Sequence, residues 1–184
     1  PRVQETLMHA LSLVPSLRDR SAVIERLLGS DQEPVVRHAL LVELARLRES
    51  AGDVAAAQKR YLQASFAIPD SKDYYSLFRS GMLLVELGEF RGAETQMRAV
   101  MDTSPDRDLA LRATVALSRV YYMTEREERA WSVLGNGGIP DVSRLNASGL
   151  YWVHALAQRL GKPGAAARAH EELKLRFPES VELQ

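Results

Sequence analysis

The sequence repeats one arrangement of glycine, alanine and proline at nearly equal intervals, and this repetition limits the folds open to the chain. Three segments of 18 residues, 52–69, 88–105 and 161–178, begin with Gly, end with Pro and carry Ala five residues after the Gly. A fixed period of about 20 to 50 residues is typical of an array of similar structural units. We therefore expect repeated units rather than one irregular core.

The same period can be followed through the whole chain by its alanines. Ala22, Ala57, Ala93, Ala130 and Ala166 are separated by 35, 36, 37 and 36 residues. A proline follows twelve residues after the alanine in four of these five cases, and Val142 takes that position in the fourth unit. The chain is therefore divided into five units.

Each unit is predicted to hold two helices joined by a tight turn. Apolar residues recur at intervals of three and four, as in Ala93, Met97 and Val100, which is helical spacing. The glycines suit turns with positive φ, and the prolines end helices because they lack an N–H group. In pairs, the expected helices are 3–14 and 19–29, 36–50 and 53–67, 73–87 and 89–102, 107–123 and 126–134, and 147–160 and 163–176.

The alanines have a mechanical role in this interpretation. Two helices of a hairpin can cross closely only where a small side chain separates their backbones, and a bulky side chain there would be overpacked. Thr124 with Glu127 has the spacing of a capping box and is expected to begin the second helix of the fourth unit. No segment alternates with the two-residue period of a strand, so the predicted fold class is all-α.

This pattern resembles the tetratricopeptide repeat (TPR), in which a loop glycine precedes an aromatic, a small, a large and a second small residue and then a proline. The middle unit has Gly88, Phe90, Ala93, Met97 and Pro105 in this order. The resemblance implies a right-handed superhelix, or solenoid, of stacked antiparallel helix hairpins. It predicts a single TPR-like solenoid domain over 1–184, a fragment of a longer protein, with repeats at 3–36, 38–71, 74–107, 111–144 and 147–180.

The composition excludes several classes of function. Lys and Arg together number 24, as do Asp and Glu, and a nucleic-acid-binding protein needs a positive surplus. The chain has no cysteine, its histidines lack metal-ligand spacing, and its apolar runs are too short for direct membrane insertion.

The Gly135–Gly138 segment follows a helix and lacks the lysine of a phosphate-binding loop, so it is expected to be a flexible connection. We expect no enzyme activity, no cofactor and no metal.

The TPR resemblance implies a non-catalytic scaffold that binds a protein or peptide segment on its concave face. The first helix of each pair would line that face, and aromatic and arginine side chains are enriched at binding hot spots. The residues expected at partner-binding positions are Arg46, Glu49, Tyr75, Phe78, Arg79, Met82, Arg112, Arg119, Tyr122 and Tyr151.

Other interpretations of the same residues remain open. The aromatic residues could pack between hairpins as core, and the arginines could pair with neighbouring glutamates. The chain could also be a structural spacer that associates with itself as a homo-oligomer. Its place would then be a bacterial envelope or secretion assembly, because the segment Arg176–Ser180 resembles bacterial periplasmic and outer-membrane accessory proteins. A third alternative is a small ligand or polysaccharide stacked on the tyrosines. The sequence does not fix the compartment beyond this weak indication of the bacterial periplasm or envelope.

Overall fold

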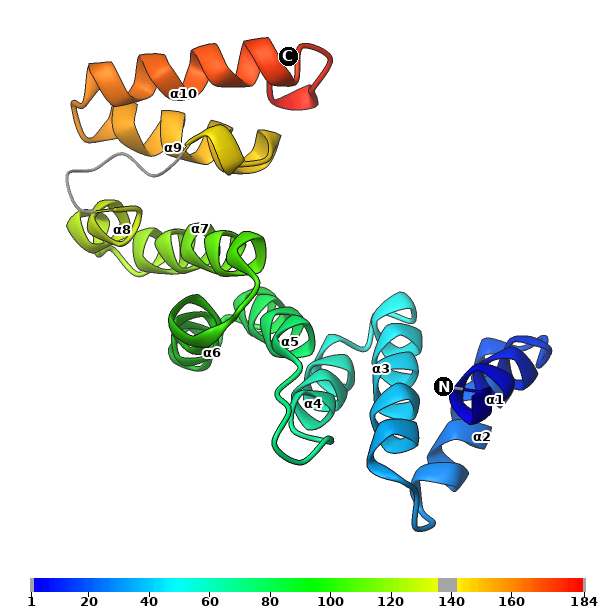
Figure 1. The fold of residues 1–184 in the computed structure, drawn as a ribbon. Helices are drawn as coiled ribbons and strands as arrows, with labels where there is room; N and C mark the ends of the chain where they lie inside the picture. The colour runs from blue at the N-terminus through cyan, green and yellow to red at the C-terminus, as the bar shows by residue number, and fades with distance from the viewer. Residues whose placement is uncertain (1, 136–141, 184) are drawn as a thin grey trace. The chain divides into compact units, whose positions relative to one another are not determined.

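The computed structural model describes residues 2–135 and 142–183, and the regular structure in these residues is helical (Figure 1). They contain ten α-helices and two short 3₁₀ helices, with an isolated β-bridge between Ile68 and Ser71. Most of the predicted connection at Gly135–Gly138 lies outside the described residues. The α-helices are α1 (Arg2–Ser12), α2 (Leu17–Leu28), α3 (Pro34–Ser50), α4 (Val54–Ser65), α5 (Tyr74–Glu86), α6 (Phe90–Thr103), α7 (Arg107–Met123), α8 (Glu127–Val133), α9 (Ala147–Arg159) and α10 (Pro163–Arg176); the 3₁₀ helices are η1 (Val142–Arg144) and η2 (Val181–Leu183).

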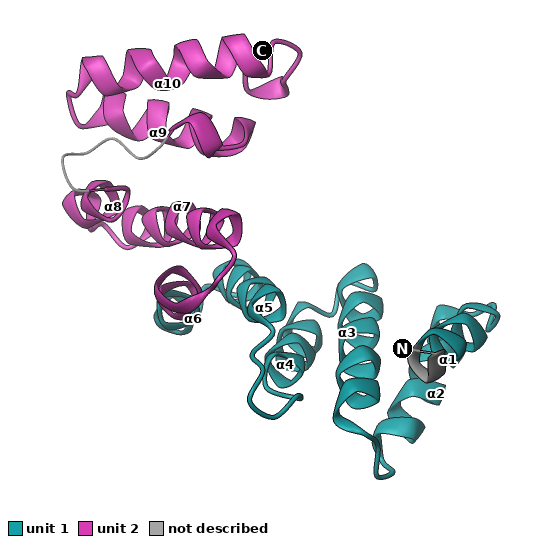
Figure 2. Cartoon of the chain, in the orientation of Figure 1, with its two compact units in different colours: residues 1–96 teal, residues 97–184 magenta. Residues whose placement is uncertain are grey.

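The ten predicted helices are confirmed, each to within two residues at either end. They form two compact units, residues 1–96 and 97–184, and the division falls inside α6 (Figure 2). That the units act together as a single domain stays a prediction.

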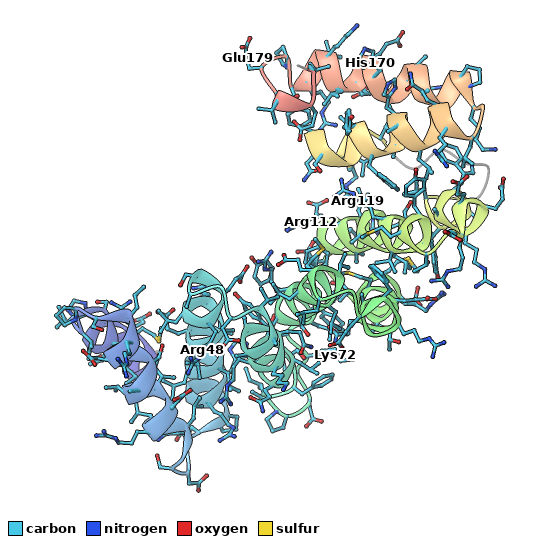
Figure 3. All side chains as sticks on the ribbon, turned by 180° about the vertical axis from the view of Figure 1, so that it is seen from behind. Arg48, Lys72, Arg112, Arg119, His170 and Glu179 are labelled. Atoms are coloured by element: carbon cyan, nitrogen blue, oxygen red, sulfur yellow. The ribbon has the colours of Figure 1, made fainter. Side chains whose placement is uncertain are left out.

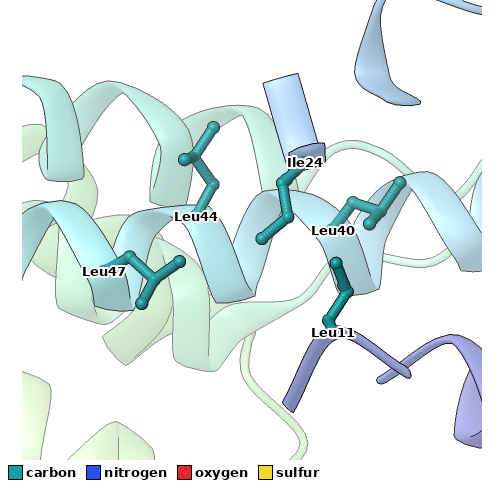
Figure 4. Packing of buried hydrophobic residues seen from close by; sticks show 5 residues of the cluster. All are labelled: Leu11, Ile24, Leu40, Leu44 and Leu47. Atoms are coloured by element: carbon teal, nitrogen blue, oxygen red, sulfur yellow. The ribbon is translucent and has the colours of Figure 1, made fainter. Parts of the chain in front are cut away.

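Helix α3 organises the core at the start of the first unit. Its Leu40, Leu44 and Leu47 meet Ile24 of α2 and Leu11 of α1 (Figure 4). Ile24, Leu40 and Leu44 are completely excluded from solvent. Burial of each such side chain contributes about 1.5–3 kcal/mol to stability. The first hairpin is therefore held on the second by aliphatic packing along one face of α3.

The predicted role of the small residues is confirmed in four units and wrong in the first. Ala57, Ala93 and Ala130 are 0% exposed and Ala166 is 5% exposed, as expected where helices approach closely. Ala22 is exposed instead and lines a shallow hollow between α2 and α3. In the first hairpin the buried residue of α2 is Ile24, so α2 packs through a different face from that predicted.

The predicted glycine turns are confirmed by their backbone angles. Gly52, Gly88 and Gly161 have φ values of 77°, 74° and 63°, and a Cβ atom added to any of them would meet nothing within 4 Å. Only the backbone conformation therefore requires glycine at these positions. The fourth unit makes the same turn with Glu125, at φ 60°.

The predicted capping box of the fourth unit is wrong. Thr124 lies at the C-terminal end of α7, where its hydroxyl donates to the Val120 carbonyl at 2.8 Å. The N-cap of α8 is Arg126, which makes no side-chain capping hydrogen bond. Thr124 therefore ends one helix rather than beginning the next.

Replacing Glu125 with glycine is expected to stabilise the fold. A left-handed conformation costs a residue other than glycine about 1–2 kcal/mol, part of which the greater freedom of unfolded glycine offsets. We expect E125G to raise the free energy of unfolding by about 1 kcal/mol in urea denaturation. The matched control, G88A, should lower it by a similar amount. An unchanged or lower stability of E125G would contradict the strain assigned to Glu125.

Candidate functional site

In the first unit, two of the residues predicted to bind a partner bind each other. Glu49 of α3 forms an ion pair with Arg79 of α5 and also accepts a hydrogen bond from the Tyr61 hydroxyl at 3.1 Å. Burial raises the pKa of Tyr61, and the neighbouring Glu49 carboxylate raises it further. These contacts tie α3, α4 and α5 together. The Glu49–Arg79 pair therefore has a structural role in this unit.

The structure does not support a partner-binding role for Phe78, because this residue is 5% exposed and belongs to the buried core. The spacing of residues along α5 does not reveal which side of the helix is buried. Of the remaining predicted residues in this unit, Tyr75 is 47% exposed, Arg46 is exposed and Met82 is partly buried.

In the second unit, two predicted residues of α7 meet α9. The Arg119 guanidinium donates from Nη2 to the Ser148 carbonyl at 3.0 Å and to its hydroxyl at 2.8 Å. It also lies over the ring of Trp152, with Cζ 5.6 Å from the ring centroid. Tyr122 packs edge-on against Trp152, with ring centroids 5.3 Å apart. We call these four partly buried residues, Arg119, Tyr122, Ser148 and Trp152, the α7–α9 surface.

A hydrogen-bond chain fixes Trp152 in this arrangement. Its indole nitrogen Nε1 donates to the Ser118 hydroxyl at 2.9 Å, and that hydroxyl donates to the Ala130 carbonyl of α8 at 2.7 Å. Ser118 is completely buried. Because the buried hydroxyl is satisfied on both sides, it holds the indole in one orientation relative to α7 and α8.

Sequence reasoning missed Trp152 and Ser148 and selected Tyr151 instead. A helix turns by about 100° per residue, so an error of one position selects another face. The signal was present in the spacing of four between Ser148 and Trp152, which places both on one side of α9. Tyr151 is 47% exposed and lies next to this surface along the chain.

Ion pairs flank the α7–α9 surface. Arg159 of α9 donates from Nε to Glu127 of α8 at 2.8 Å and lies over the Tyr122 ring at 5.4 Å. At the other end of the helices, Arg144 forms an ion pair with Asp108. Arg112, a predicted residue, is exposed on α7, and Figure 3 shows it on the same helix as Arg119.

A second polar feature of this unit is a pair of stacked histidines between α9 and α10. The rings of His154 and His170 have centroids 4.8 Å apart and planes 24° apart. His154 Nδ1 donates to the Ala166 carbonyl at 2.9 Å, because a carbonyl can only accept. Both rings line a hollow of about 500 Å³ that also includes Lys162 and Gln158.

The described residues hold neither a metal-binding cluster nor a membrane-spanning helix. Within residues 2–135 and 142–183, no group of three or more His, Cys, Asp and Glu side chains is arranged to hold a metal ion. None of the helices in the same ranges combines the length and the apolar character that crossing a membrane requires.

Comparison with known proteins identifies the fold. No protein-family model and no curated protein sequence matches the chain. Among solved structures, the MamA RS-1 ArsTM double mutant is 14% identical, with 97% of this chain and 96% of that chain covered and a TM-score of 0.71. A putative kinesin light chain from P. anserina with nearly identical TPR-like repeats is 16% identical, with 95% and 93% covered and a TM-score of 0.62. PilW, a widely conserved type IV pilus biogenesis factor, is 20% identical, with 100% and 96% covered and a TM-score of 0.53.

These likenesses extend over nearly the whole of each chain, at identities that establish the fold alone. The chain has the fold of a TPR-like helical solenoid, and the predicted all-α class of helix hairpins is confirmed.

Removing the Ser118 hydroxyl is expected to destabilise the second unit. S118A leaves the Trp152 indole N–H without its acceptor and the Ala130 carbonyl without a donor, which should lower the free energy of unfolding by about 1–3 kcal/mol. The matched control is S132A, since Ser132 is exposed and, among the described residues, its hydroxyl bonds to the Arg129 carbonyl of its own helix. Equal denaturation midpoints for the two variants would contradict the role given to Ser118.

The stacked histidines are expected to make stability depend on pH. Desolvation lowers the pKa of His170, and the positive charges of Lys174 and His154 lower it further, while Glu171 opposes them. The unfolded chain therefore binds a proton at His170 before the folded chain does, so this contribution to stability is lost as pH falls below about 6.5. Thermal unfolding of the wild type should show a larger loss between about pH 7.5 and 5.5 than that of H170F. Identical pH profiles would refute the prediction.

Proposed function

We propose that this chain is a non-catalytic scaffold that binds a segment of another protein, and that the segment lies along the α7–α9 surface. The TPR resemblance implies that the first helix of each pair lines the concave face, and both α7 and α9 are first helices. The observation that carries the proposal is the partly buried cluster of Arg119, Tyr122 and Trp152. Such side chains combine a large apolar area with a polar group and are enriched at binding hot spots.

The construction of this surface favours binding without rearrangement. Trp152 is held by Ser118, and Arg119 is held by both oxygen atoms of Ser148. Side chains that are fixed before binding lose little conformational freedom on binding, so more of the contact energy appears as affinity. The fold neighbours are compatible with a scaffold, and nothing in the proposal depends on their individual partners.

The test is photo-crosslinking from the edge of this surface. A benzophenone amino acid replaces Tyr151, which is 47% exposed, and the matched control places it at Phe66, an exposed aromatic residue of the first unit. Each protein is irradiated in lysate of the source organism, and crosslinked peptides are identified. The proposal predicts capture of one linear segment of another protein at position 151 but not at 66. Equal capture at both positions, or no capture at 151, would contradict it.

A second candidate function, self-association as a structural spacer, is favoured by a different observation. Leu175 of α10 and Val181 of η2 are 79% and 75% exposed, and contacts between copies could cover them. PilW is a type IV pilus biogenesis factor, and a place in a bacterial envelope assembly is proposed here by analogy with it alone. Sedimentation of the wild type and of L175E separates the candidates. A concentration-dependent mass that L175E abolishes would favour self-association, and a monomer at all concentrations would exclude it.

A further inference from the structure

Arg119 differs from Arg144 and Arg159 in having no acidic partner among the described residues. Arg144 pairs with Asp108 and Arg159 pairs with Glu127 in the same unit. Among the residues that the structure describes, no Asp or Glu lies within ion-pairing distance of Arg119, whose hydrogen bonds go to the neutral oxygens of Ser148. A positive charge is thus placed at a protein surface without a carboxylate from residues 2–135 or 142–183 to balance it.

Burial makes this charge costly to leave unbalanced. Arg119 is only partly exposed, and desolvation alone lowers its pKa, with no acidic group acting in the opposite direction. A partly desolvated guanidinium that lacks an anion interacts more strongly with an added carboxylate than a fully solvated one does. The surrounding structure therefore favours an anionic ligand at this point.

The free edge of the guanidinium can reach such a ligand. Nη2 makes both hydrogen bonds to Ser148, which leaves the N–H groups of Nε and Nη1 without an acceptor among the described residues. Arg119 is only partly buried, so a ligand can approach its guanidinium from solvent. A carboxylate oxygen arriving from solvent can accept a hydrogen bond there.

The rings beside Arg119 indicate what lies next to that carboxylate. The indole of Trp152 and the ring of Tyr122 meet edge-on within the same surface, and Tyr151 adds an exposed ring nearby along α9. An apolar side chain of a peptide can cover these rings while the acidic group occupies the guanidinium edge.

From this geometry we infer that the partner segment is an acidic peptide in which an Asp or Glu carboxylate accepts hydrogen bonds from Arg119 and an adjacent apolar side chain packs on Trp152 and Tyr122. The inference rests on the proposed function and specifies the chemistry of its partner. It makes Arg119 a specificity-determining residue of the α7–α9 surface.

The experiment is a selection of short random peptides displayed on phage, carried out against the wild-type chain and against R119Q. Glutamine keeps a donor for Ser148 but removes the charge, and thermal unfolding of R119Q checks that the fold is retained. We expect wild-type peptides enriched in one Asp or Glu beside an apolar residue. We expect R119Q to bind them at least about tenfold more weakly.

A double-mutant cycle separates recognition from a structural role. In the best peptide the acidic residue is changed to its amide, and both peptides are titrated against both proteins. The inference predicts that R119Q weakens the acidic peptide much more than the amide peptide. The inference is overturned, and the proposed function stands, under any of three outcomes. R119Q could weaken the acidic and the amide peptide equally, or R119Q could bind both peptides as tightly as the wild type does. The third outcome is that the selected peptides lack acidic residues. If no peptide is selected at all, both fail.

Discussion

The close contact between the two helices of a hairpin, made at a buried alanine, is the constraint on which the rest of the structure depends. Ala57, Ala93, Ala130 and Ala166 are almost fully excluded from solvent, and a positive-φ residue turns the chain at each of these hairpins. A larger side chain would separate the helices and weaken the packing of each hairpin on its neighbour. Because hairpins in a solenoid contact mainly their neighbours, a defect of this kind stays local while the remaining hairpins keep their own contacts.

The fold could be predicted from the sequence because the residues that set its turns, helix ends and helix crossings act locally. Glycine at a left-handed turn, proline near a helix end and alanine at a crossing act within a few residues, so helix positions follow from them to within two residues. Exposure could not be predicted in the same way. The residues predicted to face a partner on α5 included Phe78, which is buried. The residues predicted to face inward on α2 included Ala22, which is exposed. Whether a side chain is covered depends on how neighbouring hairpins pack, and the periodicity of the sequence does not encode this packing.

In the candidate site too, residue positions along one helix could be predicted, but contacts between helices could not. Arg119 and Tyr122 were predicted from their spacing on α7, but Trp152, which both of them contact, was not. The structure adds that Ser118 of α7 orients this tryptophan by a hydrogen bond. It also separates Arg79, which Glu49 neutralises within the first unit, from Arg119, which no described carboxylate neutralises. Thus the repeated hairpins supply the framework, and the polar contacts of individual hairpins distinguish an arginine paired with a carboxylate from one without a described carboxylate.

The most direct test of this account follows the indole N–H signals of the protein by NMR. The chain has two tryptophans, and Trp131 is 7% exposed beneath Lys162, whereas Trp152 is partly exposed on the α7–α9 surface. An acidic peptide from the phage selection is titrated into isotope-labelled protein. The account predicts that the Trp152 signal shifts with saturation while the Trp131 signal stays in place. A bound peptide that leaves Trp152 unmoved, or that shifts Trp131 alone, would contradict it.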